Sequence, residues 1–248
     1  MERNELISFT NDVSRVKSVE DLYFLEKKYS NFSNPYKDYL IGFSYMNNDD
    51  DFNSFKCFVN AAEKGIREPK KYIGSIYSDS IGSSISHILT KFQSEKLDSD
   101  IRYNLLVNSY FFLSSSINDL GITAYESYKN RAELLNKYED DLTFALIINY
   151  LGIGSIPKVL IMSDYFFASQ GYIKHGISDL SQLCLKKSVN LYNWLEDISI
   201  NGKAADSYSI EEISNIGKNR HEIIYKKLSK DFLDNKFVFD LDLVRGLY

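Results

Sequence analysis

Residues that staple or break a polypeptide chain are scarce in this sequence. Its 248 residues include two cysteines, three prolines and twelve glycines. Cys57 and Cys184 lie far apart in the chain, so they predict neither a disulfide framework nor a metal-binding pair. An all-β chain would need a turn about every 8–12 residues. The long segments without glycine or proline therefore argue against that fold class.

Long apolar runs and an excess of basic residues are also lacking. No segment approaches the roughly 20 apolar residues that span a bilayer, and the charged residues 1–12 lack the apolar core of a signal peptide. The 29 basic and 34 acidic residues give a net charge of −5, whereas a general nucleic-acid-binding surface is basic. We therefore expect a cytoplasmic protein that binds neither nucleic acid nor membrane.

Apolar residues recur at the spacing of helix faces. Aromatic residues make up 15% of the chain and favour strands by propensity, but the periodicity indicates helices. Ser18, with Asp21 three residues later, is predicted to cap one of them. Because short polar turns separate the segments, the sequence predicts an all-α fold with antiparallel neighbouring helices. The clearest faces are Phe55, Phe58, Val59 and Ala62; Leu106, Tyr110, Leu113 and Ile117; Leu191, Trp194, Leu195 and Ile198; and Ile224, Tyr225, Leu228 and Phe232.

The end of the chain has a different pattern. Residues 237–244 alternate in part between apolar and polar side chains, which predicts a short extended segment. Because an isolated strand is not stable alone, packing of this segment on the body of the protein is favoured. Docking on a partner or on a second copy stays open.

A short pattern occurs twice in the first half of the chain. Residues 39–45 (YLIGFSY) resemble residues 71–77 (KYIGSIY), so that Gly42 and Gly74 share an offset of 32 positions. Between them, residues 55–65 (FKCFVNAAEKG) predict a helix closed by Gly65. Residues 109–121 and 190–202 likewise each predict a helix that ends at a glycine.

These residues resemble the Sel1-like repeat, a relative of the tetratricopeptide repeat. Its first helix ends in Leu-Gly-x-x-Tyr and its second closes with Ala-Ala-x-x-Gly. The matching positions here are Ile41-Gly42 with Tyr45, Ala61-Ala62 with Gly65, and Ile73-Gly74 with Tyr77. The helix that carries Arg131 and Leu134 is similar to the family's frequent last unit. The resemblance is clear over about residues 36–137 and implies antiparallel helix pairs stacked as a short superhelical array.

The resemblance also predicts how the chain is divided into regions. Residues 1–142 are expected to hold N-terminal helices and repeats, and residues 143–248 a further helical region with a degenerate repeat, continuous with the first. A glycine inside a helix costs about 0.5–1 kcal/mol relative to alanine. We therefore expect Gly42 and Gly74 to lie inside first helices, where a second helix must approach closely.

Residues that could carry chemistry do not form a recognisable motif. His87, His175 and His221 are far apart in sequence, and His221 shares an apolar helix face, so a packed histidine is predicted there. The acidic residues 49–51 lack the spacing of a calcium loop and predict a solvated loop that caps the next helix. We expect no catalytic residue, no metal site and no cofactor.

The sequence therefore favours a non-catalytic protein–protein interaction module, an adaptor, regulator or inhibitor, whose partner is another protein. An immunity protein that neutralises a toxin is one such case, because the negative charge would steer a basic partner. A self-assembling structural protein and, less favoured, a hydrolase-type enzyme are the alternatives; a deep pocket with converging titratable groups would favour the enzyme. The oligomeric state is left open. The residues expected to contact the partner, on the concave face of the first helices, are Lys37, Asp38, Phe43, Lys70, Lys71 and Ser75.

Overall fold

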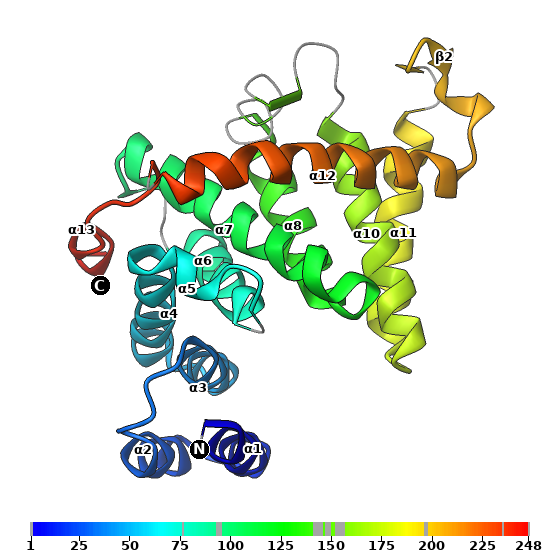
Figure 1. Ribbon diagram of the computed structural model, residues 1–248. Coiled ribbons are helices and arrows are strands. Elements are labelled where there is room, and N and C mark those ends of the chain that lie inside the picture. The colour runs from blue at the N-terminus through cyan, green and yellow to red at the C-terminus, as the bar shows by residue number, and fades with distance from the viewer. Residues whose placement is uncertain are drawn as a thin grey trace.

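The computed structural model describes residues 2–75, 77–92, 96–140, 146, 150–151, 157–195, 198–234 and 236–247. Within these residues the fold is almost entirely helical, with one small two-stranded sheet, which confirms the predicted all-α class (Figure 1). The first half contains α1 (Glu2–Val13), α2 (Val19–Lys28), α3 (Pro35–Asn47), α4 (Asp51–Arg67), α5 (Pro69–Tyr72), α6 (Ser78–Lys91), α7 (Ser99–Leu120) and α8 (Tyr125–Lys137). The second half contains α10 (Pro157–Lys174), α11 (Ser178–Trp194), β1 (Ser199–Ile200), β2 (Lys203–Ala204), α12 (Ile210–Leu233) and α13 (Asp242–Arg245).

Local sequence signals begin several helices as predicted. Ser18 caps α2 in a capping box, in which its hydroxyl accepts from the Asp21 backbone and the Asp21 carboxylate accepts from the Ser18 backbone. In the acidic loop, Asp50 caps α4 by accepting a hydrogen bond from the Asn53 backbone at 3.1 Å. These side chains satisfy amide groups that would otherwise lack a partner at the start of each helix.

Successive helices pack as an array of pairs. The pairs are α3 with α4, α6 with α7, and α8 with α10, and the second helix of each pair also packs on the first helix of the next. The first helices α3, α6 and α8 are neighbours in turn and form what we call the first-helix row. α12 departs from this order because it lies across α7 and α10 (Figure 1).

Small side chains let the helices approach each other. A Cβ at Gly42 would lie 3.0 Å from Cys57 Cβ and from the Phe58 ring on α4, as expected for a glycine at a close crossing. Two buried serines fill the same role deeper in the array, and their hydroxyls donate to backbone oxygens of neighbouring helices. Ser109 donates to Gly82 O at 2.9 Å, and Ser188 donates to Met162 O at 3.0 Å. Buried serine is thus one of the small residues that allow close helix contacts in this fold.

The predicted 32-residue register is wrong for the second pair. α5 is a single turn that starts at Pro69, and Gly74 follows it in a turn with φ +67°, outside any helix. The second pair begins instead with α6, where Gly82 approaches the backbone of Leu113 on α7. Gly65 is also not a closing glycine, because it lies within α4 and its missing side chain makes room for Ile81 of α6.

The helix predicted over residues 190–202 is wrong as well. α11 ends at Trp194, and Gly202 belongs to the turn of the β1–β2 hairpin, where Asn201 and Gly202 have φ values of 52° and 80°. Positive φ at both central residues suits the right-handed twist of a two-residue hairpin. The Asn-Gly pair is therefore the signal of a hairpin turn, and not of a helix that ends at Gly202.

The C-terminal tail packs on the body of the protein. Residues 238–240 are neither helix nor strand, and the short helix α13 follows them. Leu241 and Val244 are buried in the main core, and Arg245 forms an ion pair with Glu63 of α4. That core joins residues from both sides of position 142, while smaller clusters lie among α1–α3 and around the hairpin.

Candidate functional site

A pocket of about 240 Å³ lies where α7, α8, α10 and α12 meet, beside the one-turn 3-10 helix Gly121–Thr123. Its wall combines aromatic and aliphatic side chains with polar ones, and the polar side chains come from three helices, α7, α8 and α12. The lining residues include Ile117, Tyr128, Arg131, Phe167, Lys218, His221, Glu222 and Tyr225. Titratable side chains line this cavity, as they do in binding and catalytic sites.

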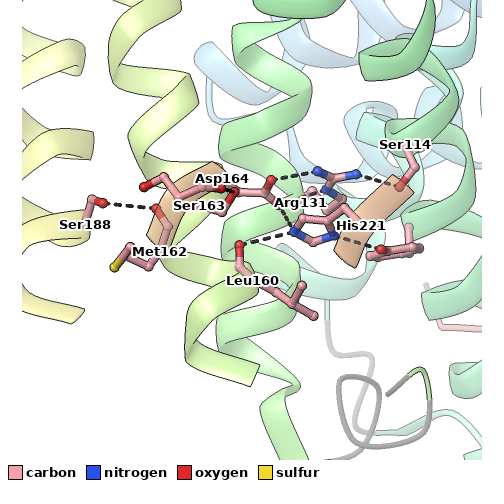
Figure 2. A network of polar contacts seen from close by, with 10 residues as sticks. Ser114, Arg131, Leu160, Met162, Ser163, Asp164, Ser188 and His221 are labelled. Carbon is pink, nitrogen blue, oxygen red and sulfur yellow. Dashed lines mark hydrogen bonds and ion pairs between the residues drawn. The ribbon is translucent and has the colours of Figure 1, made fainter. Parts of the chain in front are cut away.

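A buried ion pair underlies the pocket. Arg131 of α8 donates from Nε to Asp164 Oδ2 at 2.8 Å and from Nη2 to Asp164 Oδ1 at 2.7 Å (Figure 2). Its Nη1 donates to Ser114 Oγ on α7 at 2.8 Å. The two charged side chains are 2% and 0% exposed. The pairing uses both carboxylate oxygens of Asp164, the geometry in which arginine and carboxylate interact most strongly.

Aromatic rings surround the guanidinium. Arg131 Cζ lies 5.6 Å from the centroid of the Tyr110 ring and 5.8 Å from that of Tyr128. A cation over a ring face is stabilised by the negative charge of that face. The site therefore compensates the burial of Arg131 with one carboxylate, one hydroxyl and two rings.

His221 of α12 completes the network from the other side. Its Nε2 lies 3.2 Å from Leu160 O and 3.3 Å from Asp164 Oδ2, and its Nδ1 lies 2.8 Å from the Tyr110 hydroxyl. Burial, together with the nearby Arg131 charge, holds the pKa of His221 well below its ordinary value. Both oxygens beside Nε2 can only accept, so the neutral ring carries its proton there. Nδ1 consequently accepts the hydrogen bond that Tyr110 donates.

The hydrogen-bonding groups of His221 and Asp164 are engaged within the protein. The lone pair of the His221 ring accepts from Tyr110, and its N–H donates to Leu160 O. Both oxygens of Asp164 accept from Arg131. A general base needs a free lone pair within hydrogen-bond reach of its substrate, and the single ring lone pair of neutral His221 already accepts from Tyr110. The network joins α7, α8, α10 and α12, so its evident effect is to hold four helices together.

The neutral state of His221 makes the stability of the fold depend on pH. In the unfolded chain His221 takes up a proton as the pH falls through about 6.5, whereas the folded protein holds it neutral among Arg131, Asp164 and Tyr110. The unfolded state therefore binds more protons, and we expect the free energy of unfolding to decrease by about 1.4 kcal/mol for each pH unit below that value. Urea unfolding of the wild type and of His221→Gln over this range measures the effect. The variant should show the shallower pH dependence, and equal slopes would contradict the assignment.

The sequence pointed to Arg131 and His221 of this network and missed Asp164. Arg131 was noted through the resemblance, and His221 was predicted as a packed histidine, which its 3% exposure confirms. Asp164 lies inside the apolar run VLIMSDYFF of α10 and has no partner nearby in sequence. A lone carboxylate in a helix that is apolar on all sides is the signal that could have revealed it, because such a charge must be paired.

The residues predicted to contact a partner are not brought to one surface. On α3, Phe43 is exposed, but Asp38 is buried and paired with Lys64 of α4, and burial raises the pKa of Asp38. Lys37 is half-buried and donates to Tyr29 O at 3.0 Å. Desolvation by burial lowers the pKa of Lys37. Asp38 thus connects α3 to Lys64 of α4, and it is not the exposed partner contact that the sequence predicted.

The other three lie on α5 and in the turn that follows it. Lys70 is exposed, Lys71 pairs with Glu68 at 3.0 Å, and the Ser75 hydroxyl donates to Tyr72 O at 2.7 Å. α5 packs against α4 and α12, and not in the first-helix row. These positions therefore do not correspond to those of α3, because the 32-residue register on which the correspondence rested does not hold.

An aromatic cluster lies between α3 and α6 on the first-helix row. Tyr39, Phe43 and His87 contact one another with ring centroids 6.2 Å apart in each pair. Phe43 is 38% exposed, while the other two rings are half-buried. Burial lowers the pKa of His87 to about 4, and the charges of Lys129 and Lys91 add to this effect. The cluster is thus an uncharged aromatic surface at neutral pH, with lysines beside it.

Comparisons with known proteins give no relative from which a function could be transferred. No family model, no curated protein and no solved structure matches the chain. Within the described residues, no helix combines the length and apolar character needed to cross a membrane. In the same part of the chain, no three or more His, Cys, Asp or Glu side chains form a group that could hold a metal ion.

Proposed function

We propose that the chain is a non-catalytic protein-interaction module, a short array of helix pairs that presents its first-helix row to a partner protein. The observation that carries the proposal is the aromatic cluster of Tyr39, Phe43 and His87, because two adjacent first helices contribute to one partly exposed aromatic surface. Aromatic residues are enriched where protein interfaces bind most strongly.

The pocket over Arg131 supports the non-catalytic part of the proposal. His221 in this pocket and the buried Asp164 beneath it are engaged within the protein, so neither is placed to act as the base or nucleophile of a hydrolase-type reaction. The resemblance to Sel1-like repeats, whose members are mostly adaptors or regulators, favours the same class. A cytoplasmic location fits two buried free thiols, Cys57 and Cys184.

The charge of the chain narrows the kind of partner. A net charge of −5 favours encounter with a basic protein, for which a toxin neutralised by this chain is one example. In that case the association rate should fall as salt is added, since attraction between exposed charges is screened beyond about 10 Å at 0.1 M salt. If the partner is not basic, the immunity hypothesis is wrong, but the first-helix row is still the proposed binding surface.

Phe43→Lys tests the proposed surface. We expect a protein captured from native lysate by the immobilised wild type to be lost with this variant, because a lysine ammonium would have to be desolvated against the partner. Phe24→Lys is the matched control, since Phe24 on α2 is an exposed aromatic residue, 74% accessible, outside the first-helix row. Quantitative mass spectrometry of the captured proteins gives the readout.

The two variants separate the possible results. Loss with Phe43→Lys and retention with Phe24→Lys supports the first-helix row. Retention by both variants, or loss only with Phe24→Lys, would place the interface elsewhere and overturn the proposal. Circular dichroism of both variants establishes that each is folded, which is expected because both rings are exposed.

A further inference from the structure

The pocket over Arg131 has polar groups that the fold itself does not use. An arginine side chain carries five N–H groups, and Arg131 donates three of them, two to Asp164 and one to Ser114. The remaining two, one on Nη1 and one on Nη2, have no partner within the described residues. A buried guanidinium that lines a cavity and retains free donors is suited to bind an oxygen of a ligand.

A second cation stands at the rim of the same pocket. The Lys218 ammonium of α12 lies 5.4 Å from the centroid of the Phe167 ring on α10. No hydrogen bond or ion pair joins it to any residue in the described part of the chain, although Glu222 lies one turn further along α12 and also lines the pocket. Asp164 already balances the charge of Arg131. Lys218 is therefore the cation available to attract an anionic group.

The apolar part of the wall indicates what the body of the ligand could be. The rings of Tyr128, Phe167 and Tyr225 and the side chain of Ile117 provide an apolar, largely aromatic surface. The volume of about 240 Å³ is smaller than that of most ligand pockets, which enclose about 300–1,000 Å³. A molecule with a single ring fits this size and stacks on such walls.

From these three observations we propose that the pocket binds a small aromatic carboxylic acid. The ring of the acid packs against Tyr128, Phe167 and Tyr225, and its carboxylate accepts from Arg131 and Lys218. Glu222 at the exposed rim repels the carboxylate and weakens the affinity. The site is separate from the aromatic cluster on the first-helix row, so it does not depend on the proposed protein partner.

Phenylacetate is the probe that tests this site, and phenylacetamide is its uncharged counterpart of the same shape. Isothermal titration calorimetry of the wild-type chain should show saturable binding of phenylacetate, and at least tenfold weaker binding of phenylacetamide. Lys218→Met should weaken phenylacetate about tenfold, the loss expected for one charge-assisted hydrogen bond. Glu222→Gln should strengthen it, because the repulsion at the rim is removed.

Lys226→Met is the matched control for the loss of one charge. Lys226 is an exposed lysine of the same helix, and it does not line the pocket. Its affinity for phenylacetate should equal that of the wild type. The proposal is overturned if phenylacetate does not saturate the wild type, if the amide binds as well as the acid, or if Lys226→Met loses as much as Lys218→Met. None of these residues is fully buried, so each variant should fold, and its thermal unfolding checks this.

Discussion

Replacing Arg131 with methionine will lower the free energy of unfolding by about 3–5 kcal/mol, the cost of leaving a buried charge without its partner. The carboxylate of Asp164 is fully buried and accepts two of its hydrogen bonds from Arg131. Methionine has a similar volume but no donor. Burial already raises the pKa of Asp164 while the guanidinium opposes this rise, so the variant should also hold Asp164 protonated. Urea unfolding at neutral pH measures the loss.

Two further variants show whether the loss comes from the unpaired charge. Arg131→Met combined with Asp164→Leu removes both charges, and it should recover much of the stability, because apolar replacement of a buried pair is often neutral. Lys28→Met breaks the exposed ion pair with Asp12, where the two side chains are 60% and 25% exposed. That change should cost less than about 1 kcal/mol. If Arg131→Met costs no more than Lys28→Met, the buried pair does not stabilise this fold.

The class of fold could be predicted because it depends on local patterns. The helix face of Phe55, Phe58, Val59 and Ala62 is buried in α4 as the spacing indicated. Ser18 caps α2 for reasons contained within four residues of sequence. Burial of a periodic face and capping of a helix start need no knowledge of distant segments, so one sequence suffices to identify them.

The register of the array could not be predicted, because the role of a glycine depends on what approaches it. Gly42 and Gly82 lie at close helix crossings, whereas Gly74, in the more similar sequence context, lies in a turn with positive φ. Gly65 follows Ala-Ala like a closing residue but faces Ile81 of the next pair. A crossing partner and a turn both select glycine, and only the folded arrangement separates the two causes.

The candidate site was only partly predictable for a related reason. Its network joins Ser114, Arg131, Asp164 and His221 from four helices that are distant in sequence. The pairing of Arg131 with Asp164 follows from the packing of α8 against α10, and the position of His221 follows from α12 crossing α7 and α10. Neither contact has a spacing that sequence periodicity could reveal. The sequence shows that these polar residues are present, but it does not show that they contact one another in the fold.

The crossing of α12 over α10 gives the second large expected effect. Gly217→Ala should lower the free energy of unfolding by about 1–3 kcal/mol, although alanine favours helices by about 1 kcal/mol over glycine. A Cβ at Gly217 would lie 2.5 Å from Val159 O and 2.5 Å from Ser163 Cβ on α10. A backbone oxygen cannot rotate away as a flexible side chain can, so α12 must move outward. Thermal and urea unfolding measure the cost.

The same displacement should reach the pocket, because α12 carries Lys218 directly after Gly217 and Glu222 within the next two turns. Gly246→Ala is the matched control: its Cβ would meet Leu243 O at 3.6 Å, an ordinary contact, so its stability should stay within about 0.5 kcal/mol of the wild type. If Gly217→Ala is as stable as this control, α12 does not approach α10 closely enough at Gly217 to exclude a Cβ atom. The close crossing that positions His221 and the rim of the pocket would then need another cause.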